Sequence, residues 1–151
     1  MNDAPGEYAG FVTRAIAFAI DVAIIDLAAA IVAIVVGLGI SAFDVPDVVV
    51  TITVVVGGVA FFAWFVGYFA TFWSTTGQTP GARVMGVRVV CAGGEPVRLS
   101  AAIVRLAGMA LAAIPLFAGF LLILIDDRRR GLQDRLARTV VVYAPGGRRL
   151  S

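Results

Sequence analysis

Residues 11–40 read FVTRAIAFAIDVAIIDLAAAIVAIVVGLGI, an apolar run interrupted by one arginine and two aspartates. At a rise of about 1.5 Å per residue, a helix of this length exceeds the ~30 Å hydrocarbon layer of a bilayer, so the run predicts a transmembrane helix. An ionised side chain inside a membrane costs from about 2.5 kcal/mol upward. We therefore expect Arg14, Asp21 and Asp26 to face other parts of the protein or a wet cavity, where they can find partners.

The composition of the whole chain is that of an integral membrane protein. Its 151 residues are 60% hydrophobic and 15% charged, with a mean hydropathy of +0.97, which is too apolar for a soluble domain of this size. The chain has no histidine and one cysteine, Cys91, so neither a usual zinc ligand set nor an intrachain disulfide can form. We recognise no nucleophile–base set and no phosphate-binding loop, and therefore expect no enzyme activity, no metal and no cofactor.

Four further segments follow the first helix, and together they predict a single domain that is all-α apart from a small β element. The segments are an uncharged second helix at 48–73, a surface segment at 74–99, a third apolar segment at 101–125 and a basic tail at 126–151. The second helix ends in aromatic residues, which favour membrane interfaces. Within the surface segment, residues 87–90 and 97–99 alternate between apolar and polar and predict a small β-hairpin.

The positions of the charges predict the orientation of the chain. Arginines outside the apolar spans are confined to residues 74–100 and the tail, so the positive-inside rule places both in the cytoplasm, together with the N-terminus. Three complete crossings would instead put the tail on the opposite side. We therefore expect residues 101–125 to break at Pro115 and Gly119 and return as a re-entrant hairpin. The alternative is one continuous span kinked at Pro115. Either way we expect a multi-pass protein of the cell (inner) membrane.

Arg14 has several candidate partners. Arg14 and Asp21 are seven residues apart and share one helix face, but they are separated by ~10.5 Å along the axis. A direct pair is therefore not the simplest expectation. The long arginine side chain can extend to the membrane interface, where carboxylates of the tail could receive it. The candidates in the tail are Asp126, Asp127 and Asp134.

Asp21 and Asp26 allow more than one interpretation. Asp21 is either a site that exchanges a proton or a cation, or the anion of a permanent pair with Arg105 that fixes the register of the helices. Asp26 lies ~140° around the helix from Asp21, so it either faces a different neighbour or is protonated.

Three motifs, in order along almost the whole chain, resemble the RDD family of small membrane proteins, which is named for one arginine and two aspartates. They are RAIAFAID at residues 14–21, GQTPGARVMGVRVV at 77–90, and GLQD at 131–134 followed by TVVV at 139–142. The signature falls on Arg14, Asp21 and Asp134. The chain departs from the family pattern at Gln133, where the family has histidine. The resemblance implies that the Asp134 segment folds back to Arg14 and that residues 139–143 pair with the strand at 87–90.

Two functions remain open. Some RDD proteins resemble cation/proton antiporters, which implies translocation of a cation, proton or small solute along Arg14, Asp21 and Arg105. A chain with two or three crossings encloses little volume, so translocation would require a homo-oligomer. The alternative is a non-transporting adaptor or accessory subunit, whose arginine-rich face binds anionic lipid headgroups or a partner membrane protein. We expect the lipid bilayer, and no nucleic acid, to be the partner of the basic tail.

Overall fold

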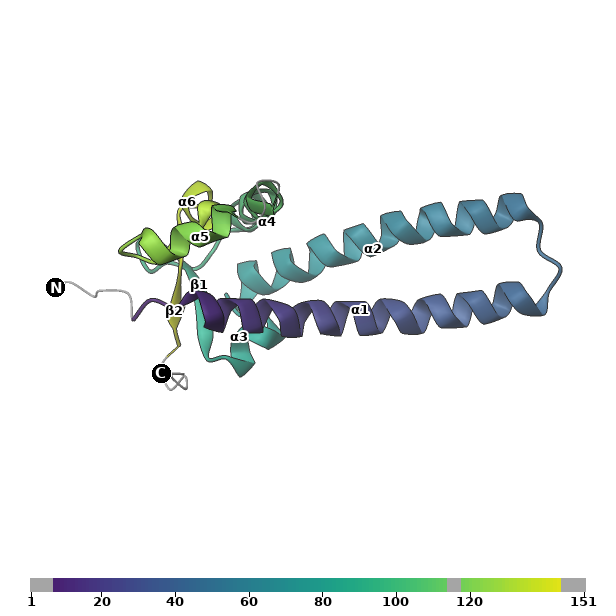
Figure 1. Cartoon of the computed structure of the whole chain (residues 1–151), viewed down its shortest axis with the longest axis horizontal. Helices are drawn as coiled ribbons and strands as arrows, with labels where there is room; N and C mark the ends of the chain where they lie inside the picture. Colours follow the sequence, from purple (N-terminus) through teal and green to yellow (C-terminus); the bar gives the residue numbers. More distant parts are fainter. Residues whose placement is uncertain (1–6, 114–117, 145–151) are drawn as a thin grey trace.

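The two longest elements form an antiparallel helical hairpin (Figure 1). The computed structural model describes residues 7–113 and 118–144. Helix α1 spans Phe11–Ala42 and helix α2 spans Asp47–Thr75, in good agreement with the predicted spans 11–40 and 48–73. Both helices are long and apolar enough to cross a membrane. Nearly all their side chains beyond Asp26 on α1 and before Phe65 on α2 are exposed, as expected for surfaces that face acyl chains.

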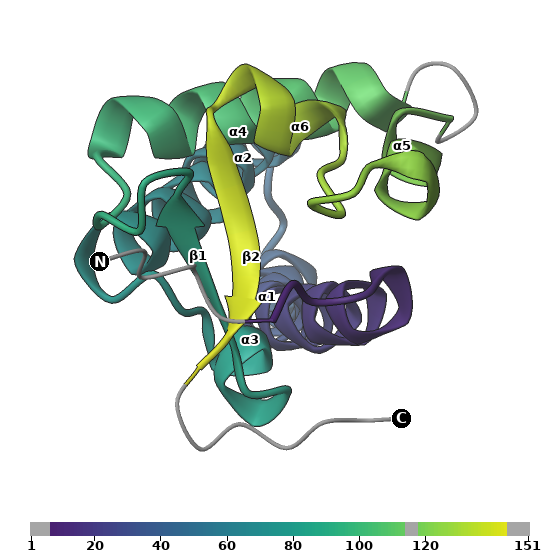
Figure 2. The ribbon, with the colours of Figure 1, turned by 90° about the vertical axis from the view of Figure 1, so that its left-hand side faces the viewer.

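The shorter elements gather at one end of this hairpin and form what we call the head (Figure 1). They are α3 (Pro80–Val84), β1 (Val87–Cys91), α4 (Leu99–Ala113), α5 (Ala118–Ile125), α6 (Leu132–Leu136) and β2 (Thr139–Tyr143). Figure 2 shows the two strands between α4 and α6 on one side and α1 and α3 on the other. The buried core lies here, where Phe69 and Trp73 of α2 pack with valines of both strands.

The small sheet joins two distant parts of the chain. Strands β1 and β2 pair antiparallel, with Val87 opposite Tyr143 and Cys91 opposite Thr139, as the family resemblance implied. The predicted β-hairpin between residues 87–90 and 97–99 is wrong, because Leu99 already begins α4. One edge of β1 is paired with β2, and on its other edge the amide of Val89 donates to the carbonyl of Gly77.

The third apolar segment consists of two helices. Helix α4 has 15 residues and α5 has 8, so neither reaches the ~20 residues of a transmembrane helix, and the two pack against each other. Gly119 lies inside α5 and ends no helix, while Pro115 lies outside the described residues. Because β1 and β2 pair directly, the segment between them begins and ends at the same end of the molecule. Entry of α4 and α5 into the hydrocarbon layer stays a prediction.

Helix α3 contacts α1 at backbone distance. Thr79 accepts a hydrogen bond from the amide of Ala82 and Pro80 occupies the first turn, a favourable start for a short helix. A Cβ added at Gly81 would lie 2.1 Å from the carbonyl oxygen of Ala17 and 2.9 Å from Cγ of Asp21. Glycine at this position therefore lets α3 approach α1 closely.

We expect Gly81→Ala to lower the free energy of unfolding by about 1–3 kcal/mol, because the added methyl group meets rigid backbone. Thermal unfolding of the detergent-purified protein, followed by circular dichroism, measures this effect. Gly93→Ala is the matched control, since a Cβ at Gly93 meets nothing within 4 Å. Equal Tm values for the two variants would contradict the close approach of α3 to α1.

Candidate functional site: a buried arginine–aspartate cluster

Asp134 is the centre of a buried charge cluster. Asp134 is 0% exposed and lies in the first turn of α6, where its carboxylate accepts a hydrogen bond of 3.0 Å from the amide of Gly131. The same carboxylate forms ion pairs with Arg14 of α1, at 2.6 Å, and with Arg105 of α4. One acid thus receives two arginines from separate helices, which we call the arginine–aspartate cluster: Arg14, Arg105 and Asp134.

Both arginines are held in place by further contacts. Nε of Arg14 donates to the carbonyl oxygen of Ala9 at 3.1 Å, and Nη1 of Arg105 donates to Oγ1 of Thr139 at 2.9 Å. The guanidinium of Arg105 also lies 4.9 Å from the ring centre of Trp73, within the range of a cation–π interaction. The cluster therefore connects α1, α2, α4, α6 and β2.

The cluster contains more positive than negative charge. Two arginines and one aspartate leave one positive charge, and the side chains of Arg14 and Arg105 are only 11% and 7% exposed. Nη2 of Arg14, Nε of Arg105 and Oε1 of Gln133 are buried without a hydrogen-bond partner among the described residues. A buried polar group left unpaired costs about 1–3 kcal/mol. These three atoms are therefore well suited to bind an additional group.

Asp21 occupies a separate position with neutral partners. Its carboxylate accepts hydrogen bonds from the amide of Gly81 at 2.7 Å, from the hydroxyl of Tyr68 at 2.9 Å, and from the hydroxyl of Thr79. The predicted Asp21–Arg105 pair is therefore wrong. The start of α3 lies against this part of α1 and supplies two of the three donors, so both oxygens of the buried carboxylate are satisfied without a cation.

Of the tail acids proposed for Arg14, the structure selects Asp134. Asp126 instead pairs with Arg130 at 3.0 Å and Arg135 at 2.7 Å, and the hydrogen bonds from Arg130 hold the pKa of Asp126 below its ordinary value. This interaction stabilises the fold above the ordinary pKa of an aspartate and is lost as the pH falls toward the lowered value. Asp127 is exposed.

Asp26 is exposed on the surface of α1. It has no ion pair or hydrogen bond to any residue of the described part of the chain. Asp26 therefore belongs to neither the arginine–aspartate cluster nor the Asp21 site.

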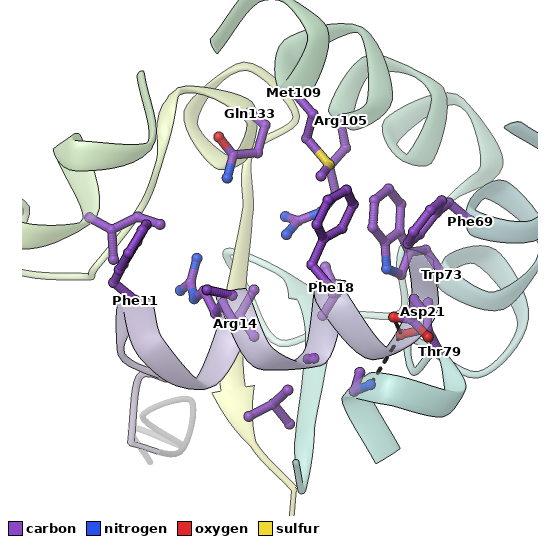
Figure 3. Close-up of a pocket in the computed structure, with 17 residues that line it drawn as sticks. Phe11, Arg14, Phe18, Asp21, Phe69, Trp73, Thr79, Arg105, Met109 and Gln133 are labelled. Atoms are coloured by element: carbon purple, nitrogen blue, oxygen red, sulfur yellow. Dashed lines mark hydrogen bonds between the residues drawn. The ribbon is translucent and has the colours of Figure 1, made fainter. Parts of the chain in front are cut away.

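A cavity of about 300 Å³ separates α1 from α4 and α6. Figure 3 shows Arg14, Arg105 and Gln133 pointing into it from three helices, with Asp21 on its far wall. Apart from these polar groups and Thr79 the lining is apolar, including Phe11, Phe18, Phe69, Trp73, Met109 and Ile123. The cavity thus combines two arginines, each with one unpaired N–H group, with a hydrophobic wall.

Comparison with known proteins identifies the family of this chain. The sequence profile of the RDD family matches residues 8–138. The chain belongs to the RDD family. It is also 35% identical over 88 residues to the proline-rich antigen homolog of two Mycobacterium tuberculosis strains. The aligned region covers 58% of this chain. The chain spans about a third (35%) of the length of those relatives. No solved structure matches it.

The three signature residues of this RDD protein thus fall into two groups. Arg14 and Asp134 are direct partners, whereas Asp21 belongs to the contact between α1 and α3. Neither Thr79 nor Tyr68 could be identified from sequence, because Thr79 lies in a turn-forming stretch and Tyr68 among aromatic residues typical of a membrane interface. Gln133 is distinguished in the sequence only by its departure from the family pattern, but in the structure it lines the cavity.

We expect Asp21→Ala to destabilise this RDD protein more than Asp21→Asn. Alanine leaves the buried amide of Gly81 unpaired, at a cost of about 1–3 kcal/mol, while asparagine keeps one acceptor oxygen and nearly the same shape. Thermal unfolding in detergent measures both effects, and Asp26→Ala is a control at an exposed aspartate of the same helix. Equal losses for the two Asp21 variants would argue that the negative charge itself is required.

Proposed function

We propose that this RDD protein is a non-transporting membrane protein that binds the anionic headgroup of a lipid at its arginine–aspartate cluster. The observation that carries the proposal is that Arg14 and Arg105 line one cavity and that each has a buried guanidinium N–H group without a partner among the described residues. Charge-assisted hydrogen bonds from arginine to phosphate are among the strongest in proteins.

The charge of the cluster favours an anion. Asp134 neutralises one of the two arginines, and its carboxylate already accepts three hydrogen bonds. The cluster and Asp21 together have a formal charge of zero, but the oxygens of Asp21 are occupied by three neutral donors and it forms no ion pair with a described arginine. A phosphate oxygen would supply the acceptor that Arg14 and Arg105 lack. A hydroxyl of the same headgroup could donate to Oε1 of Gln133.

The apolar lining favours a lipid over a free anion. Phe11 is half-buried and Phe18 is 37% exposed, so both extend from the cavity to the surface of α1. Met109 of α4 and Ile123 of α5 complete this side. A headgroup at the arginines would thus leave its glycerol and acyl carbons against hydrophobic side chains.

The distribution of charge along the molecule supports an anionic membrane surface. Every arginine in the described ranges lies in the head, its loops or the second turn of α1, whereas Asp44 and Asp47 lie at the opposite end of the helical hairpin (Figure 1). By the positive-inside rule, the head would face the cytoplasm. Each arginine near an anionic leaflet contributes about 1 kcal/mol, so such a membrane would hold the head against its surface.

Translocation has less support from the geometry. The polar groups of the cavity end at Asp21, and beyond Asp26 helix α1 carries no further charge. The space between the outer parts of α1 and α2 is lined by apolar side chains and one threonine. The described residues of a single chain therefore form no continuous polar path across the membrane.

Lipid binding can be followed through Trp73, which lines the cavity, in a Trp64→Phe background that removes the other tryptophan. We expect brominated phosphatidylglycerol to quench Trp73 at about tenfold lower mole fraction than brominated phosphatidylcholine, equivalent to ~1.4 kcal/mol of preference. Ala15→Phe should remove this preference, because Ala15 is an exposed residue at the edge of the cavity and a phenyl group there blocks entry.

Ala19→Phe is the matched control for this blocking variant. Ala19 is also exposed, lies one turn further along α1 and is not among the residues that line the cavity. The preference for the anionic lipid should survive in this variant. Equal quenching by the two lipids, or full competition by inorganic phosphate alone, would contradict the lipid proposal.

The translocation alternative has its own measurement. We expect proteoliposomes carrying a pH gradient to show no cation flux above that of empty vesicles, over a series of monovalent and divalent cations, because α1 after Asp26 and α2 after Asp47 supply no charged group for a path within or between copies. Flux that Asp21→Asn abolishes in a protein that still folds and inserts would overturn the non-transporting assignment and establish Asp21 as an exchange site.

A further inference from the structure

Asp26 lies in the membrane-spanning part of α1 and forms no ion pair or hydrogen bond with the described residues of the head. It lies 15 residues after Phe11 and 16 before Ala42, so it is about 22 and 24 Å from the two ends of the helix. Its side chain is exposed, and no described residue pairs with it. A carboxyl group facing acyl chains is costly, and such groups usually meet a partner within the membrane.

An apolar groove begins beside this acid. It has a volume of about 870 Å³ and lies between the outer parts of α1 and α2, which hardly touch each other. Ala33 and Gly37 line it, and they are seven and eleven residues after Asp26, so each lies within about 20° of Asp26 around α1. Gly57 and Gly58 line the opposite wall. Small residues on both walls allow a third helix to approach closely.

The chain itself offers no cation for Asp26 in the described ranges. Trp64 of α2 lies at a similar depth, 17 residues after Asp47, but its neutral indole makes no hydrogen bond to Asp26. The hydroxyls of Thr51 and Thr53 lie farther from the head and donate to carbonyl oxygens of their own helix. The described arginines lie in the head, its loops or the second turn of α1.

We propose that this groove binds a transmembrane helix of another membrane protein, which carries a lysine or arginine at the depth of Asp26. Charge complementarity selects this occupant over a second copy of the chain. A second copy in the same orientation would present its own Asp26 and the same uncharged part of α2 at that depth, so two acids would meet. The groove is separate from the cavity at the arginine–aspartate cluster, and its use does not depend on lipid binding there.

Energy transfer in neutral phosphatidylcholine vesicles tests the proposal with the full chain. The donor dye is attached to Cys91, the single cysteine. The acceptor is attached to synthetic leucine–alanine transmembrane peptides that carry lysine or leucine at the depth of Asp26. We expect the lysine peptide to associate at about tenfold lower concentration than the leucine peptide. A peptide with lysine at the mirrored depth should behave like the leucine peptide.

Two substitutions separate the roles of charge and shape. Asp26→Leu should remove the preference for lysine, whereas Asp44→Asn, at the far end of the helical hairpin, should preserve it. Gly57→Leu should weaken association of the lysine peptide by filling the groove. Gly67→Leu is its control, since a Cβ at either glycine meets nothing within 4 Å but Gly67 does not line the groove.

Three results would overturn the proposal. Equal association of the lysine and leucine peptides would mean that acyl chains alone fill the groove. Unchanged association in Gly57→Leu would place the helix elsewhere. Transfer between donor- and acceptor-labelled copies of this protein that Asp26→Leu abolishes would make a second copy the occupant.

Discussion

The burial of Asp134 between two arginines is the interaction on which the head depends. A buried carboxylate is tolerated when donors surround it, and here a backbone amide and two guanidinium groups do so. Arg14 comes from the second turn of the first membrane helix and Arg105 from α4, so the acid determines where α6 lies relative to both. The sheet then follows, because Thr139, which accepts from Arg105, begins β2. Removing one charge would therefore affect the whole head.

The cluster and the Asp21 site each bury a carboxylate, but they satisfy it with different kinds of donor. In each, a carboxylate from one helix is satisfied by donors from elements distant in sequence, but Asp134 uses cations and Asp21 uses neutral groups. Neutral donors cost less to bury than arginine, and they add no positive charge. The cluster thus carries one surplus positive charge, while Asp21 connects α3 to α1 through its hydrogen bonds from Gly81 and Thr79.

Much of the fold could be predicted from sequence, because hydropathy over a whole membrane span is an additive signal that single residues do not overturn. This is why α1 and α2 were predicted nearly at their observed ends. The partners of Asp21 and Asp134 could not be derived from helix geometry alone, because they depend on how α3 and α6 approach. Those approaches are set by Gly81 and Gly108, where an added Cβ would lie 2.1 and 2.7 Å from backbone atoms of the opposing element. The family resemblance correctly placed Asp134 near Arg14 because it conveys this tertiary information.

Helix α1 runs without interruption for 32 residues, from the base of the arginine–aspartate cluster to the far loop. It contains no proline, and its glycines lie near its outer end, so the part between Arg14 and Asp26 has no hinge. A bilayer whose thickness does not match the span makes such a helix tilt. Any tilt of α1 relative to α4 would therefore move Arg14 and Phe18 at the cavity as one rigid unit.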